Sequence, residues 1–318
     1  MSQPETRKPE FADRLAAAVT QRKTPVMVGI DPRWERLPEG LRDDGDRASP
    51  AQRAAAYRRF CREVIDVVAP LVAVVKPQAA FFEQLGVAGM EALADCVAYA
   101  RAAGLLVVLD AKRGDIGSTA AAYADGLLGV AQAGFFAADA VTVNPYLGDD
   151  ALEPFVDVAR QRDGGVFGLV KTSNAGSGML QDLLADGRPI YRHVADYVEG
   201  ISRRQPGRCG YGVAGAVVGA TYPEQLAELR KAMPHCWLLV PGFGSQGATA
   251  ADVAGAFDAH GLGAVINSSR HIIFAHARPP YAERFAAANW QRAVEAATRD
   301  MIERLRSDTP AGRLAQEA

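Results

Sequence analysis

Two acids and a lysine stand together where a strongly apolar segment of the sequence ends. Residues 105–109 form an unbroken run of leucine and valine, which is typical of a strand buried on both faces of a parallel sheet. Asp110, Lys112 and Asp115 follow at the carboxyl end of this run. Because side chains alternate along a strand, we expect Asp110 and Lys112 to point the same way. Charges at the rim of a core are costly unless they are paired with each other or used in a reaction.

The spacing of these charges has a structural and a chemical interpretation. A lone Asp-x-Lys pair is as readily a structural ion pair at a strand end as part of a reactive centre, since ion-pair networks also have structural roles. The longer pattern Asp110-x-Lys112-x-x-Asp115-Ile116-x-x-Thr119 is far more specific than the pair. We therefore take the longer pattern as the candidate catalytic motif.

Strand-like and helix-like segments alternate along the chain. The predicted strands are residues 26–31, 71–76, 105–109, 140–143, 166–170, 215–219, 237–240 and 264–266. Helices are predicted after these strands, at residues 50–69, 83–103, 118–130, 149–162, 188–204, from 223 onward, 248–260 and 280–306. Eight strand-then-helix units in series, with no linker between them, predict a single-domain (β/α)8 TIM barrel. An open doubly wound sheet is the alternative architecture.

The two ends of the chain lie outside this repeating pattern. Phe11, Leu15 and Val19 recur at helical spacing, so residues 10–22 are predicted to form a leading helix within an N-terminal extension of residues 1–24. The barrel is then expected to occupy residues 25–307, and residues 308–318 are predicted to be a disordered tail.

Polar residues gather at the predicted carboxyl ends of the strands, which carry the chemistry of such barrels. In chain order they are Asp31, Lys76, Asp110 with Lys112, Asn144, Ser173, Gln246 and Arg270. Taken alone, Lys76 would be a solvated strand end and Asp31 a turn residue before Pro32. The position of Lys76 one strand before Asp110 and Lys112 favours a place in the site instead. The longest loops, after the first and fifth strands, are predicted on the same rim and are typical of functional loops.

A glycine-rich loop follows the seventh predicted strand. Its sequence, Gly242-Phe-Gly244-Ser-Gln246-Gly247, matches the G-x-G-x-x-G pattern of dinucleotide-binding folds, but the following strand lacks the acid that would bind a ribose. Phosphate binding by the loops after the seventh and eighth strands is typical of barrels. Backbone N–H groups of the glycines and the guanidinium of Arg270 suit that purpose.

The chain resembles the orotidine 5′-phosphate decarboxylase family, in particular its long bacterial form. The resemblance rests on the motif that begins at Asp110, on Lys76 and on the residues that match the family's phosphate site, and it covers nearly the whole barrel. It implies these site residues: a charge network of Lys76, Asp110, Lys112 and an Asp115 from a second subunit, ribose contacts from Asp31 and Thr119, a pyrimidine contact from Ser173, and phosphate contacts from Gln246 and Arg270.

The resemblance also implies a reaction and an assembly. Orotidine 5′-monophosphate would be converted to uridine 5′-monophosphate and carbon dioxide, the last step of de novo pyrimidine synthesis, with no cofactor. Lys112 would stabilise the developing carbanion and donate the proton, while Asp110 would hold Lys112 and keep it charged. The implied assembly is a homodimer with shared active sites, in which Asp115 and Thr119 serve the neighbouring barrel.

The chain departs from the family pattern around the phosphate. The sequence Asn267-Ser-Ser-Arg270 replaces the glycine that many relatives have just before the arginine. The loop after the seventh strand is also short for a lid, so the loop after the fifth strand, with Gly176 and Gly178, is expected to share that duty.

Two other functions remain alternatives. Magnesium-dependent sugar-phosphate decarboxylases and aldol-type synthases share the Asp-x-Lys-x-x-Asp motif, but they carry an acidic metal ligand where this chain has Lys76. A phosphate-binding barrel that has lost catalysis is the second alternative, and the intact Asp110, Lys112 and Lys76 argue against it.

Composition excludes several other classes of protein. The chain has 318 residues, 49% of them hydrophobic, and a net charge of −2, so neither nucleic acid nor a membrane is an expected partner. No apolar run approaches the length of a membrane span, and the first residues lack an apolar signal core. The four cysteines are far apart, as expected of thiols in a reducing cytoplasm, and the histidines show no metal-ligand spacing, so no metal is predicted.

Overall fold

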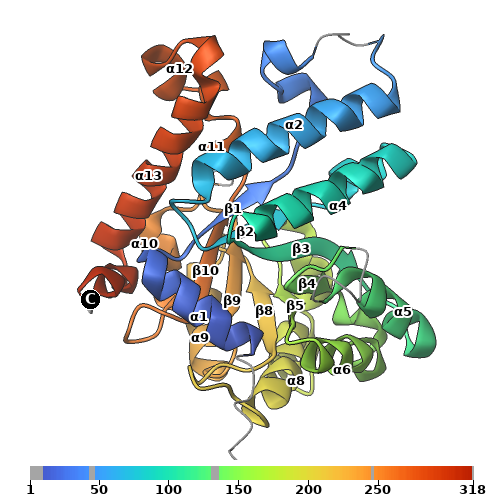
Figure 1. Cartoon of the computed structure of the whole chain (residues 1–318). Coiled ribbons are helices and arrows are strands. Elements are labelled where there is room, and N and C mark those ends of the chain that lie inside the picture. The colour runs from blue at the N-terminus through green and yellow to red at the C-terminus, as the bar shows by residue number, and fades with distance from the viewer. Residues whose placement is uncertain (1–9, 43–46, 130–135, 245–246, 317–318) are drawn as a thin grey trace, which may run out of the picture.

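A closed parallel barrel forms the centre of the computed structural model, which describes residues 10–42, 47–129, 136–244 and 247–316 (Figure 1). Within these residues the strands follow the order β1-β10-β9-β8-β5-β4-β3-β2, and β1 pairs with both β10 and β2. The barrel strands are β1 (Val26–Ile30), β2 (Val74–Pro77), β3 (Leu106–Arg113), β4 (Ala140–Val143), β5 (Gly165–Lys171), β8 (Ala214–Val218), β9 (Leu238–Pro241) and β10 (Ala264–Ser268). This closure confirms the predicted TIM barrel and rules out the open sheet.

Helices surround the barrel and connect its strands (Figure 1). The longer ones are α2 (Pro50–Val68), α4 (Gly86–Ala102), α5 (Gly117–Leu127), α6 (Glu153–Gln161), α8 (Ile190–Arg203), α9 (Pro223–Ala232) and α13 (Trp290–Asp308). Helix α2 begins where the sequence directs it, because Ser49 and Gln52 form a capping box and Pro50 occupies the first helical turn. The strands between these helices are almost wholly buried, which explains their continuous apolar sequences.

Helix α1 (Phe11–Arg22) packs where the strands begin, at the end of the barrel opposite the predicted site. The Phe11 ring meets the Phe167 ring edge-on at 6.1 Å between centres. A side chain at Gly165 would collide with Phe11, so this glycine permits the close approach. Arg14 donates a 2.7 Å hydrogen bond to Asp139, which stands just before β4. The leading helix therefore closes the amino-terminal end of the barrel.

Four segments differ from the sequence-based expectation. The helix expected at 248–260 is reduced to α10 (Ala250–Val253) and a 3-10 helix, Ala254–Ala256. The third strand continues past residue 109 to Arg113, with a register shift against β4. The helix expected at 280–306 is interrupted, with a short α12 (Tyr281–Arg284) before α13. Residues Pro310–Ala315 form a 3-10 helix with Ala311 and Leu314 buried, where the sequence predicts a disordered tail. In each case tertiary contacts outweigh the local pattern.

The loop after β5 has structure of its own. It carries α7 (Gly178–Gln181) and a two-stranded hairpin of β6 (Leu184–Ala185) and β7 (Arg188–Pro189) before α8 begins. A long loop with internal structure fits the expectation that this rim is functional. The short helices α3 (Ala80–Glu83), α10 (Ala250–Val253) and α11 (Arg270–Ile273) follow β2, β9 and β10.

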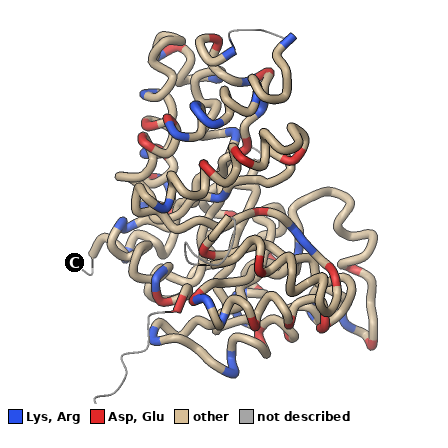
Figure 2. Tube along the Cα trace, turned by 45° about the vertical axis from the view of Figure 1, so that its right-hand side comes forward, with Lys and Arg blue, Asp and Glu red and all other residues tan. Residues whose placement is uncertain are grey.

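Charged residues of both signs are spread along the described chain (Figure 2). Lys and Arg positions are mixed with Asp and Glu positions, which are present in similar numbers, 35 and 37. Among the described residues, no helix is both long and apolar enough to cross a bilayer.

Candidate active site

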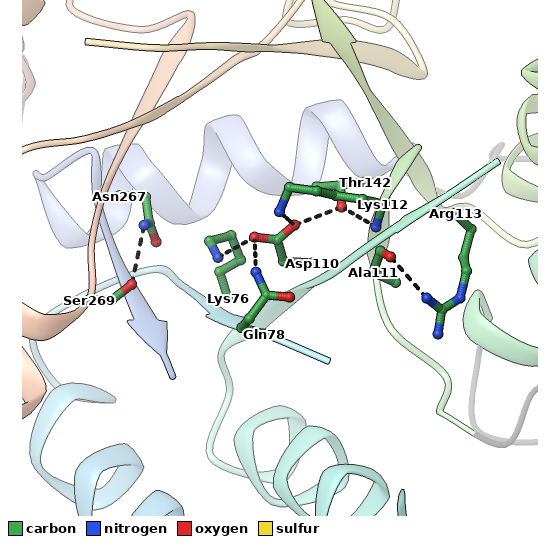
Figure 3. A network of polar contacts seen from close by, with 9 residues as sticks. All are labelled: Lys76, Gln78, Asp110, Ala111, Lys112, Arg113, Thr142, Asn267 and Ser269. Carbon is green, nitrogen blue, oxygen red and sulfur yellow. Dashed lines mark hydrogen bonds and ion pairs between the residues drawn. The ribbon is translucent and has the colours of Figure 1, made fainter. Parts of the chain in front are cut away.

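Asp110 is the centre of a polar network at the carboxyl end of β3 (Figure 3). Lys76 Nζ donates to Asp110 Oδ2 at 2.7 Å, and Lys112 Nζ donates to Oδ1 at 2.5 Å. Thr142 Oγ1 donates to Oδ1 at 2.9 Å, and Gln78 Nε2 donates to Oδ2 at 2.9 Å. Each carboxylate oxygen therefore accepts one ammonium and one neutral donor, and three neighbouring strands or their ends supply the four groups.

A distortion of β3 turns Lys112 toward Asp110. Leu109 pairs with Val141 and Arg113 with Val143, so extra residues of β3 bulge between these two pairs. Lys112 lies in this bulge with a positive φ of 47°, a conformation that is strained for a residue with a side chain. Its backbone N–H donates to Thr142 Oγ1 at 3.0 Å, which helps to stabilise the bulge. The predicted convergence of Asp110 and Lys112 is confirmed, but through a bulge rather than regular alternation.

The carboxylate of Asp110 is charged, and the two lysines that bind it differ in exposure. Burial alone would raise the pKa of Asp110, but the charges of Lys76 and Lys112 outweigh it and hold the pKa well below its usual range. Burial alone would lower the pKa of Lys76, but the charges of Asp110 and Asp31 and the hydrogen bond to Asp110 raise it. The side chain of Lys76 is only 5% exposed, whereas that of Lys112 is 46% exposed. Lys112 is thus the lysine that a bound molecule can reach.

A cavity of about 750 Å³ opens over this network. Its polar lining includes five predicted site residues beside Asp110, namely Asp31, Lys76, Lys112, Ser173 and Arg270. Apolar side chains from β5, β8 and β9 form part of its wall, among them Leu169, Val217 and Leu239. A mostly apolar cavity with a few convergent polar groups is the usual form of a small-molecule site.

Two oxygen atoms in this cavity are buried without a hydrogen-bond partner among the described residues. They are Oδ1 of Asp31, at the end of β1, and Oδ1 of Asn267, on β10. Gly29 lies beside Asn267 and Ser269, and a side chain at Gly29 would collide with Ser269. A bound molecule with hydroxyl groups would satisfy such acceptors.

Two predicted site residues do not reach the cavity of their own barrel. Asp115 Oδ1 accepts a 2.8 Å hydrogen bond from the Ile116 N–H just before α5, and Thr119 is exposed on the first turn of that helix. Neither lines the cavity. Gln246, which is also a predicted site residue, lies outside the described residues.

Sequence reasoning missed Gln78, Thr142 and Asn267. Gln78 follows Lys76 by two positions, and the alternation of side chains along a strand predicts that the two point the same way. Thr142 looked like an ordinary residue of an apolar strand, and only the pairing of β3 with β4 brings it to Asp110. Among the described residues, no group of three or more His, Cys, Asp or Glu side chains is arranged to hold a metal ion.

A closed (β/α)8 barrel with a Lys–Asp–Lys network under a cavity at its carboxyl rim defines a TIM-barrel enzyme for a small molecule. A family model described as "Orotidine 5'-phosphate decarboxylase / HUMPS family" matches residues 24–285. The chain therefore belongs to the orotidine 5′-phosphate decarboxylase family.

Curated relatives and solved structures agree with this assignment. An orotidine 5′-phosphate decarboxylase of Rhodopirellula baltica is 56% identical and covers 93% of this chain and 99% of its own length. One of Deinococcus radiodurans is 43% identical, with 88% and 94% covered. A crystal structure of a putative orotidine-monophosphate decarboxylase from Toxoplasma gondii has a TM-score of 0.79 at 32% identity, with 98% of this chain and 99% of that chain covered. One from Streptomyces avermitilis has a TM-score of 0.77 at 36% identity, with 99% of each covered.

Proposed function

We propose that this protein converts orotidine 5′-monophosphate to uridine 5′-monophosphate and carbon dioxide. The observation that carries the proposal is the alternation of charge along Lys76, Asp110 and Lys112 under the cavity, in a chain of this family. Loss of the carboxylate leaves negative charge on a ring carbon with nothing in the substrate to delocalise it. The protein must therefore stabilise that charge and supply a proton.

Lys112 performs both tasks in this proposal. Its ammonium is fixed 2.5 Å from Asp110 Oδ1 and is exposed to the cavity, so it faces the reacting carbon of a bound substrate. An ammonium placed in advance stabilises a developing carbanion without reorganisation, and it then acts as the general acid. Asp110 keeps Lys112 oriented and charged, while Lys76 holds Asp110 from the other side.

The remaining parts of the cavity suit the rest of a nucleotide. Arg270, at the start of α11 after β10, supplies a guanidinium for the phosphate, and Gln246 in the preceding loop is its proposed partner. Asp31 Oδ1, which is buried without a hydrogen-bond partner among the described residues, is available to a ribose hydroxyl. Ser173, at the end of β5, contacts the pyrimidine. Binding of the phosphate then contributes energy to the chemistry at the ring.

We also propose that the active unit is a homodimer with shared sites. Asp115 and Thr119 lie outside their own cavity, although the resemblance assigns them to the charge network and the ribose. Large apolar side chains are exposed near them or after β4, which suits an interface between two copies; they are Ile116, Tyr123, Tyr146 and Leu147. A two-fold dimer makes the exchange of Asp115 and Thr119 reciprocal.

We also propose that the protein works in the cytoplasm. All four cysteines are free thiols in the structure, and three of them are buried. Unpaired cysteines are typical of proteins that work in a reducing compartment.

One assay tests the proposed reaction and separates it from the magnesium-dependent alternative. The loss of orotidine 5′-monophosphate absorbance is followed with purified protein before and after exhaustive chelation. Equal turnover is expected, because the buried Lys76 ammonium beside Asp110 would repel a cation at this rim. Turnover that is lost with the chelator and restored by magnesium would contradict the proposal and favour the sugar-phosphate class. No turnover in either state would favour a binding protein.

A further inference from the structure

Lys171, the last residue of β5, is fully buried although it takes no part in the network around Asp110. Its Nζ donates to Asp182 Oδ1 at 2.6 Å and lies 3.4 Å from Ser177 Oγ. The same ammonium lies 4.7 Å from the centre of the Tyr222 ring, a distance at which a cation is attracted to an aromatic face. Through these contacts the buried lysine joins β5 to the loop that follows it, which carries Ser177 and Asp182, and to the loop after β8, which carries Tyr222.

The loop after β5 is built on these contacts. Gln181, the last residue of α7, precedes Asp182 and binds the backbone next to Lys171. The Thr172 N–H donates to Gln181 Oε1 at 3.0 Å, and Gln181 Nε2 donates to Thr172 Oγ1 at 2.8 Å. Gln181 and the neighbouring Leu180 line the active-site cavity. The part of the cavity wall that α7 forms is therefore attached at two consecutive residues, Lys171 at the end of β5 and Thr172 just after it.

Ser173 is the next residue and also lines the cavity. Its carbonyl oxygen accepts from Thr221 Oγ1 at 3.2 Å, and the Lys171 carbonyl accepts from the Gly219 N–H at 2.7 Å. Ser173 is thus held directly by the loop after β8, whereas residues 178–182 are bonded to Lys171 and Thr172, the two residues that precede it. Among the described residues, the ion pair between Lys171 and Asp182 lies on the α7 side.

We propose that Lys171 is a positioning residue for the pyrimidine site. Its ion pair with Asp182 fixes the α7 segment and, through it, the orientation of Ser173 toward the substrate ring. This inference rests on the proposed decarboxylation of orotidine 5′-monophosphate. The Asp182 side chain is 43% exposed, whereas that of Lys171 is fully buried, so the pair joins a buried ammonium to a carboxylate near the surface.

The physical reason is the cost of an unpaired buried charge. Without the Asp182 carboxylate, the Lys171 ammonium would keep a hydroxyl and aromatic faces as partners, which do not neutralise it. The loop then rearranges to bring water to the ammonium, and Thr172, the residue before Ser173, loses its contacts with Gln181. The opposite side, at Thr221 and Gly219, stays intact, so the barrel itself is not disturbed.

A double-mutant cycle tests this coupling. Asp182→Asn, Ser173→Ala and the double variant are assayed for kcat and KM with orotidine 5′-monophosphate. Asp182→Asn is expected to lower kcat/KM about tenfold in the wild-type background but less than about twofold in the Ser173→Ala background, since its effect acts through Ser173. Asp196→Asn breaks the exposed 2.6 Å pair with Arg188 nearby and is the matched control, with unchanged kinetics expected.

Equal losses in both backgrounds would overturn the inference, because the pair would then act on general stability alone. Wild-type kinetics for Asp182→Asn would overturn it as well. If Asp182→Asn does not fold, the charge-free double variant Lys171→Met/Asp182→Leu is taken through the same cycle, with the same expected non-additivity. Absence of turnover by the wild-type protein would instead refute the proposed function, so the two failures are distinguishable.

Discussion

Asp110 is the residue on which the charges of the site depend. It accepts from two lysines, a threonine and a glutamine, and its carboxylate is nearly buried. Because the folded protein holds the pKa of Asp110 below its value in an unfolded chain, this residue stabilises the fold above the usual carboxyl pKa. The stabilisation is lost progressively as the pH falls below that value.

Asp110→Asn is expected to destabilise the protein by about 3 kcal/mol at pH 7, since it removes the carboxylate that is paired with the buried Lys76 ammonium. The difference from wild type should stay constant between about pH 5 and 7 and shrink below about pH 4, where the unfolded wild-type chain takes up a proton. Urea unfolding at several pH values measures it. A difference that grows toward acid pH would show the opposite linkage.

Lys112→Ala tests the proton donor. Turnover is expected to fall by at least about a thousandfold, because the variant loses both the general acid and the charge that stabilises the carbanion. The fold should survive, since the Lys112 side chain is 46% exposed and contributes little to the core. Turnover and thermal unfolding are measured on the same preparation. Near-normal turnover in a folded variant would remove Lys112 from this role.

At the scale of elements, the pairing of β3 with β4 shapes the site. The bulge in β3 places Lys112 in a positive-φ conformation, and Thr142 on β4 binds both ends of the bulge. Its hydroxyl donates to Asp110 and accepts from the Lys112 N–H. The orientation of the reactive ammonium therefore depends on a neighbouring strand, not only on its own.

Thr142→Val removes this hydroxyl while keeping the branched shape. We expect kcat to fall about tenfold, and the free energy of unfolding by about 1–3 kcal/mol, because a buried N–H and one carboxylate oxygen lose a partner. Thr142→Ser, which retains the hydroxyl, should stay within about threefold of wild type in kcat. Steady-state kinetics compare the two variants. Equal losses in both would assign the effect to packing rather than to the hydroxyl.

At the scale of the whole molecule, two residues that the resemblance assigns to the site do not line the cavity of their own barrel. The cavity contains Lys76, Asp110 and Lys112, whereas Asp115 and Thr119 point elsewhere at the start of α5. In the proposed dimer, a second copy would contact the exposed apolar side chains beside them, such as Ile116 and Tyr123.

Complementation between subunits tests the shared site. Lys112→Ala and Asp115→Ala proteins, each expected to be nearly inactive, are mixed in equal amounts under conditions that allow exchange. Half of the dimers are then mixed, and each mixed dimer has one doubly damaged and one intact site. Activity should recover to about a quarter of wild type. No recovery, with exchange verified by mass spectrometry, would mean that Asp115 serves its own barrel.

The sequence by itself determined the barrel and the central charges of the site. Continuous apolar runs followed by helical segments predicted the strand-helix alternation, and β4 lies at the predicted residues 140–143. Asp110 and Lys112 were identifiable because they directly follow the apolar run of residues 105–109, and Lys76 because it ends the predicted strand before it. Such local patterns show which side chains are buried on folding, because burial depends on whether each individual side chain is apolar.

Tertiary structure decided what lies beside these charges. Thr142 reaches Asp110 only because closure of the barrel sets the register of β4 against β3, and the bulge at Lys112 arises from that same pairing. Leu314 is buried near the end of the chain because its segment packs against the folded protein, and no local pattern predicts that packing. Lys171 has a counter-charge because the loop after β5 brings Asp182 to 2.6 Å from its ammonium. Contacts between distant segments depend on the closed shape, so they cannot be predicted from spacing alone.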